Sequence, residues 1–108
     1  MIDLTKLITA EQKAEQAKEA AIAANTAAIQ AELDRQAQLK GYDNIVSACS
    51  YASGPDSDPF AAEGRAFLAW RSAVWTQAYA VLAEVEAGTK PMPTPEESVA
   101  QMPALTLP

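Results

Sequence analysis

Few side chains in this sequence could do chemistry. Its 108 residues include one cysteine and no histidine, which excludes Cys/His metal sites, Ser-His-Asp triads and disulfide frameworks. Cys49 has no neighbouring lysine to lower its pKa, so we expect a small buried hydrophobe. Asp56 and Asp58 share a loop, and helix capping explains Asp58 better than cation binding. Because no paired carboxylates or phosphate-binding loop appear, we predict a non-enzymatic chain with no catalytic residues, metal or cofactor.

The composition narrows the class of partner. A net charge of −6 argues against binding a nucleic-acid backbone. No apolar run approaches the length of a membrane span, so no membrane partner is expected either. Alanine, the strongest helix former, occupies 24 positions. These features favour a soluble, intracellular, non-catalytic, all-α helical protein.

Helix start and stop signals divide the chain into a single elongated helical domain over 1–108. We expect two long antiparallel helices with a short helix at the turn and a Pro-rich C-terminal segment that carries another short helix. The expected segments are an arm at 1–9, a long helix at 10–40, a short helix at 43–52, a long helix at 59–87, and a tail at 89–108 with a helix at 95–102.

Each boundary has a local cause. Thr9 and Gln12 form a capping-box pattern before the first long helix, and Gly41 follows its end. Asp58-Pro59 has the cap-then-proline order of a helix start, and Gly88 ends that helix. The remaining two starts are assigned to Asp43 and to Thr94-Pro95-Glu96-Glu97. Two thin rods of this length leave flanks uncovered, which points to a partner or to another copy of the chain.

A row of alanines follows one side of the first long helix. Ala10, Ala14, Ala17, Ala21, Ala24, Ala28 and Ala31 alternate spacings of four and three, as the a and d positions of a heptad do. Such a row lets a facing helix approach closely. Two interpretations remain open: the helix at 59–87 packs there, or a second copy or another coiled coil docks there.

The second long helix carries most of the aromatic residues. On a helical wheel Phe67 and Val74 share a face, while Trp70 and Trp75 point to different sides. Either one tryptophan is core and the other half-exposed, or a tryptophan belongs to a partner-binding face. We also expect Gly64 to mark close packing against another backbone, such as the short helix.

Two other features have open interpretations. Arg71, among apolar residues, is expected to extend to solvent or to pair with a carboxylate such as Asp43. The tail contains Met92, Val99, Met102, Leu105 and Leu107, and it either folds back on the helices or reaches onto a partner.

Three segments carry a resemblance. They are GYDNIVSACSYA at 41–52, FAAEGRAFLAWRSAVW at 60–75 and PTPEE at 93–97. Together they resemble a helical domain of small tailed-phage proteins encoded beside tail-fibre genes, known as tail-fibre assembly chaperones or fibre-associated proteins. The resemblance covers roughly residues 10–107 and brings no catalytic residues. Many members carry an extra N-terminal segment before the long helix, a place where this sequence shows only the short arm.

The resemblance implies a helical-bundle or coiled-coil protein that assists virion assembly of a bacteriophage. Its partner would be the tail-fibre protein, at its C-terminal region, and it would act in the host cytoplasm or stay on the virion tail. The expected partner-binding residues are Tyr42, Tyr51, Phe67, Trp70 and Trp75. Two alternatives remain: a structural virion component retained on the fibre, and a self-contained homo-oligomeric helical bundle.

Overall fold

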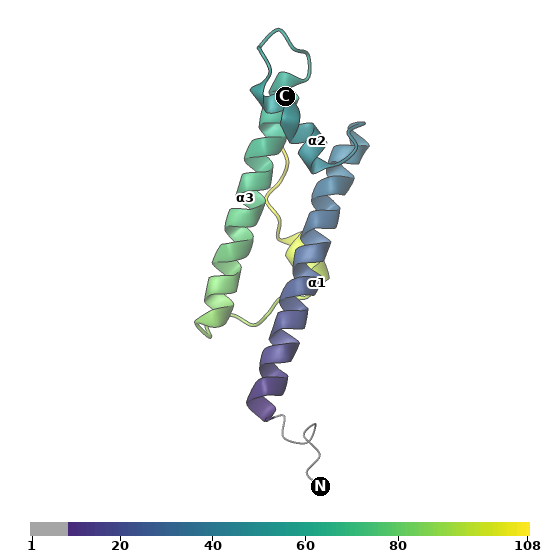
Figure 1. Cartoon of the computed structure of the whole chain (residues 1–108). Helices are drawn as coiled ribbons and strands as arrows, with labels where there is room; N and C mark the ends of the chain where they lie inside the picture. Colours follow the sequence, from purple (N-terminus) through teal and green to yellow (C-terminus); the bar gives the residue numbers. More distant parts are fainter. Residues whose placement is uncertain (1–8) are drawn as a thin grey trace.

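A computed structural model describes residues 9–108 and confirms the all-α fold (Figure 1). Two long helices run antiparallel, a short helical segment lies at the turn, and a second short helix lies near the C-terminus. The elements are α1 (Ala10–Leu39), α2 (Ile45–Ser50), the 3-10 helix η2 (Tyr51–Ser53), α3 (Ala61–Glu86) and α4 (Pro95–Ala100). The expected arm at 1–9 falls almost wholly outside the described residues.

The capping residues explain most boundaries. Thr9 and Gln12 form the expected capping box, and Thr94 and Glu97 form a second one at α4. Gly41 follows α1 with a φ of 92°, a left-handed conformation in which glycine avoids the steric cost of a side chain. These local signals were readable from the sequence because each depends only on residues within one turn.

Two expected starts are displaced. The N-cap of α2 is Asn44, whose side chain accepts from Ser47 N at 2.8 Å, and not Asp43. Helix α3 begins at Ala61, two residues later than expected, because Asp58 closes a preceding turn by accepting from Phe60 N at 2.8 Å. Both shifts lie within the usual uncertainty of helix ends.

The two long helices are splayed. Their backbones hardly approach one another, since α1 packs mainly on α4 and α2, while α3 packs on η2 and α2. The chain after α4 runs between them towards the turn (Figure 1). The Cα radius of gyration is 18.6 Å, against about 13 Å for a compact domain of this length.

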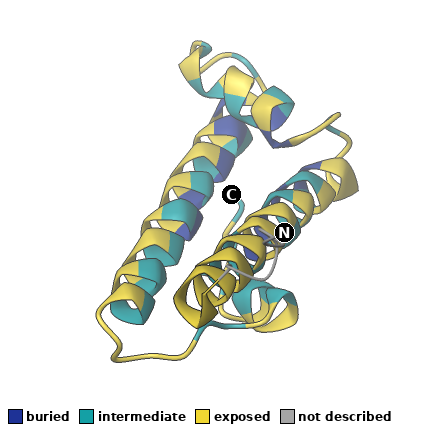
Figure 2. Cartoon of the chain, turned by 60° about the horizontal axis from the view of Figure 1, so that its bottom comes forward, coloured by how far each residue is buried: buried dark blue, intermediate teal, exposed yellow. Residues whose placement is uncertain are grey.

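The core lies at the turn end of the helix pair. Its buried side chains come from three helices: Ile29, Leu33 and Ala37 on α1, Ile45 and Ala48 on α2, and Phe67, Trp70 and Val74 on α3. The N-terminal half of α1, by contrast, is exposed on nearly every face (Figure 2). Burial is therefore concentrated where α2 closes the turn.

The alanine row on α1 does not pack against α3, so the first of its two interpretations is wrong. Ala10, Ala14, Ala17, Ala24 and Ala31 are exposed, and only Ala21 and Ala28 are half-buried. The core instead receives the face that carries Ile29 and Leu33. Larger side chains bury more apolar area than alanine, so they decide which face of the helix turns inward.

Gly64 marks the close backbone approach expected from the sequence. A Cβ built on it would lie 2.8 Å from Ala52 N and 2.9 Å from the Tyr51 carbonyl carbon. The η2 turn therefore rests directly on the first turns of α3. Arg65 holds the same turn by donating to Ala52 O at 3.2 Å and to Gly54 O at 2.9 Å.

Candidate functional site

A buried amide holds the C-terminal segment against α1. Asn25, which is 7% exposed, donates from Nδ2 to Pro93 O at 2.9 Å. Its Oδ1 accepts from Ser98 Oγ, also at 2.9 Å. A buried polar side chain needs such partners, because an unpaired one costs about 1–3 kcal/mol. Asn25 therefore fixes α4 and the segment before it against the middle of α1.

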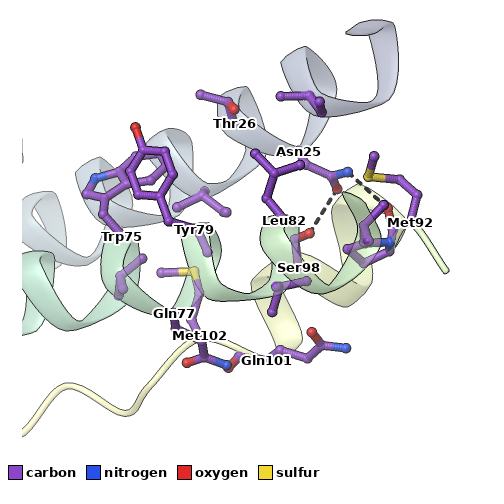
Figure 3. A pocket seen from close by; sticks show the side chains of 17 residues that line it. Asn25, Thr26, Trp75, Gln77, Tyr79, Leu82, Met92, Ser98, Gln101 and Met102 are labelled. Atoms are coloured by element: carbon purple, nitrogen blue, oxygen red, sulfur yellow. Dashed lines mark hydrogen bonds between the residues drawn. The ribbon is translucent and has the colours of Figure 1, made fainter. Parts of the chain in front are cut away.

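This arrangement leaves a pocket between α1 and α3 (Figure 3). Its volume is about 210 Å³, and its lining is mostly apolar. The walls include Ile22 and Ile29 from α1 and Trp75, Leu82 and Val85 from α3. Met92 and Met102 contribute flexible thioether side chains near α4. We call this feature the inter-helix pocket.

A partly exposed row on α3 adjoins the pocket. It consists of Leu68, Arg71, Trp75 and Tyr79, spaced at three and four residues so that all lie on one side of the helix. Leu68 is 46% exposed and Tyr79 is 70% exposed. Trp75 and Tyr79 also line the inter-helix pocket. We call these four residues the α3 row.

The chemistry of the α3 row suits protein binding. Tryptophan, tyrosine and arginine are the residues most enriched at energetic hot spots of interfaces. Arg71 forms no ion pair among residues 9–108, so the expected pair with Asp43 is absent there. Its guanidinium lies beside Cys49 instead. An apolar row of this kind, with an unpaired cation in it, presents a surface on which a partner can bury area.

Two of the expected partner-binding residues lie in the core. Phe67 has 0% exposure and Trp70 has 6%. Trp70 also donates from Nε1 to Pro103 O at 2.7 Å. A partner could reach the Phe67 ring only by opening the chain's own core, and the Trp70 ring only by displacing the C-terminal segment that covers it, so we withdraw both from the exposed candidate interface. The structure thus separates the tryptophans: Trp70 is core, and Trp75 is half-buried.

Tyr42 and Tyr51 belong to an aromatic cluster at the turn. The Tyr42 ring lies 5.6 Å from Tyr51 and 5.7 Å from Phe67, and Tyr51 in turn lies 5.4 Å from Phe60. Tyr51 is 37% exposed and Phe60 is 50% exposed. The surface-accessible part of this cluster is therefore Tyr51 with Phe60, a residue that the sequence reasoning did not single out.

Two titratable groups near the site have raised pKa values. Burial raises the pKa of Tyr42 to about 12, and the nearby Glu63 carboxylate adds to the rise. Burial also raises the pKa of the Cys49 thiol, against the opposite effect of Arg71. A thiol with a raised pKa is a poor nucleophile at neutral pH.

Among the described residues, no three His, Cys, Asp or Glu side chains gather in an arrangement that could hold a metal ion. No helix between residues 9 and 108 is long and apolar enough to cross a membrane. Searches of protein-family models, curated proteins and solved structures return no match to this chain.

Sequence reasoning missed Leu68, Tyr79 and Asn25 as contributors to this region. Leu68 precedes Trp75 by seven residues and Tyr79 by eleven. This helical spacing would have placed Leu68 and Tyr79 on the same side of the helix as Trp75. Asn25 had a weaker signal, a lone amide on the side of the helix that carries Ile22 and Ile29. Its partners come from the C-terminal segment, which a local pattern cannot reveal.

Proposed function

We propose that this chain is a non-catalytic interaction protein that binds an apolar surface of a tail-fibre protein of a bacteriophage and assists fibre assembly. The α3 row is the observation that carries the proposal, because Leu68 and Tyr79 are large apolar side chains left uncovered beside an apolar pocket. The resemblance of the sequence supplies the class of partner.

The physical demands of fibre assembly are compatible with this role. Trimeric fibres have to align three chains before long β-structures close, and non-local pairing is slow and exposes aggregation-prone edges. A small helical protein can cover an apolar fibre surface during that time. The net charge of −6 would help to keep the loaded complex in solution.

The first test is light scattering with size-exclusion chromatography on the chain alone and after co-expression with the product of the neighbouring fibre gene. A defined complex with the fibre supports the proposal. A stable homo-oligomer that ignores the fibre refutes it and favours the self-contained bundle. If purified virions contain the chain in fixed ratio to the fibre, the role is that of a retained structural component.

The second test concerns the surface. Trp75→Ala and Tyr79→Ala are expected to weaken fibre binding about tenfold or more, because both remove hot-spot side chains. Leu39→Ala is the matched control, since Leu39 is 66% exposed at the end of α1 and lies outside the α3 row. Circular dichroism should show helicity unchanged in all three variants. Equal binding by all three would remove the α3 row as the interface.

A further inference from the structure

The last seven residues of the chain lie in the gap between the two long helices. Residues 102–108 follow α4 without regular secondary structure and run towards the turn (Figure 1). They line a hollow together with Glu32 and Gln36 on α1 and Trp70 on α3, and Leu105 and Leu107 pack against the core. Because the backbones of α1 and α3 hardly approach one another, this segment fills space that would otherwise be an open groove. We call that space the tail groove.

The segment binds the tail groove with alternate side chains. Leu105 and Leu107 are half-buried and pack against the core, whereas Ala104, Thr106 and Pro108 are exposed. This period of two is the pattern of an extended chain with one face buried. The groove therefore holds apolar side chains at every second position of this extended segment.

The polar contacts of the segment do not depend on its sequence. Trp70 donates from Nε1 to Pro103 O at 2.7 Å within the segment, and Gln77 donates from Nε2 to Gln101 O at 2.8 Å just ahead of it. Both acceptors are main-chain carbonyls, which any peptide supplies. Residues 103–108 form no backbone–backbone hydrogen bonds with other described residues. A segment held this way can be displaced, since no regular element has to unfold with it.

From these contacts we infer that the tail groove is a binding site for an extended partner segment with apolar side chains at alternate positions, and that the chain's own C-terminus occupies it until displaced. The inference deepens the proposed function by naming the part of the partner that is recognised. Main-chain acceptors would provide affinity, and the positions of Leu105 and Leu107 would provide selectivity. Met102, the first residue of the segment, also lines the inter-helix pocket, so the groove and the pocket adjoin.

The test uses substitutions in the whole chain that displace residues 102–108 from the tail groove. Leu105→Asp with Leu107→Asp places two charges on the buried positions and should free the groove. Thr106→Asp with Pro108→Asp is the matched control, because it adds the same charge at exposed positions. The probe is a fluorescently labelled peptide with the sequence of residues 101–108, and binding is measured by fluorescence anisotropy. A peptide with Asp at both Leu positions is the negative probe.

We expect the labelled peptide to bind the Leu105/Leu107 variant at least tenfold more tightly than either the wild-type chain or the control variant. The negative probe should not bind. Equal binding to all three proteins, or no binding to a Leu105/Leu107 variant of unchanged helicity, overturns the inference. If that variant fails to fold, a photo-crosslinker at the Leu105 position of the peptide tests the wild-type chain. Crosslinks in excess peptide should map near Gln36 and Trp70, and crosslinks elsewhere refute the site.

The fibre arm of the test separates this inference from the proposed function. Release of the segment should strengthen fibre binding several-fold, whereas the control variant should bind the fibre as the wild-type chain does. Unchanged fibre binding after release would refute the fibre as the source of the segment. If the variants bind the peptide but none of them binds the fibre, the proposed function is refuted. The peptide result would then still support the tail groove as a binding site.

Discussion

Gly64→Ala tests how tightly η2 rests on α3. In an exposed helix the substitution would stabilise the chain by about 1 kcal/mol, because alanine is the better helix former. Here the added Cβ would lie 2.8 Å from Ala52 N and 2.9 Å from the Tyr51 carbonyl carbon. Both atoms belong to the backbone, so no side-chain rotation can relieve the overlap. Overpacking of this kind costs roughly 1–3 kcal/mol.

The steric cost is expected to exceed the gain in helix propensity, which leaves a net destabilisation of up to about 2 kcal/mol. For a domain of this size that corresponds to a fall in Tm of up to roughly 15 °C. Thermal unfolding followed by circular dichroism provides the measurement. Ser72→Ala, at an exposed position of the same helix, is the control and should leave Tm unchanged or slightly higher. A Gly64→Ala chain with a raised Tm would show that η2 does not pack on α3 as described.

Three further predictions follow from the buried groups. Folding raises the pKa of Tyr42 from 10.0 to about 12. The stability linked to its neutral hydroxyl is therefore present below pH 10 and is lost as the pH rises towards 12. Tyr42→Phe should remove that part of the pH dependence of Tm, and an unchanged profile would contradict the burial of the hydroxyl. Asn25→Ala should lower the free energy of unfolding by about 1–3 kcal/mol, and a cycle with Ser98→Ala in urea unfolding should show that the two losses do not add. Trp70→Ala should cost about 3–5 kcal/mol and Trp75→Ala clearly less; similar losses in chemical denaturation would mean that the two tryptophans share one environment.

The sequence determined the helical elements and most of their ends. The signals were local: the capping box at Thr9, the proline and early acids at Pro95, and the glycine at Gly41 each act within one turn. The close approach at Gly64 was also readable, since glycine inside a helix is unfavourable unless something packs on it. The elements themselves therefore needed no tertiary information.

Tertiary structure decided which faces are buried. The alanine row on α1 has a regular heptad spacing, yet Ile29 and Leu33 turn inward because they remove more apolar area from water. The same competition placed Trp70 inside and left Trp75 half-buried, although both lie on one helix. A periodic pattern identifies the faces of a helix. Which face becomes buried depends on the apolar area that each can bury against the neighbouring elements.

The path of the C-terminal segment was likewise open from the sequence. Met102, Leu105 and Leu107 suited either an internal core or a partner, because an apolar extended segment carries no signal for where it packs. The segment packs in the space between the splayed helices α1 and α3. Trp70 holds it by a hydrogen bond to Pro103 O, and Asn25 holds the chain ahead of it by a hydrogen bond to Pro93 O. Contacts between residues far apart in the chain depend on the arrangement of whole helices, so only the folded chain could establish the tail groove and the α3 row.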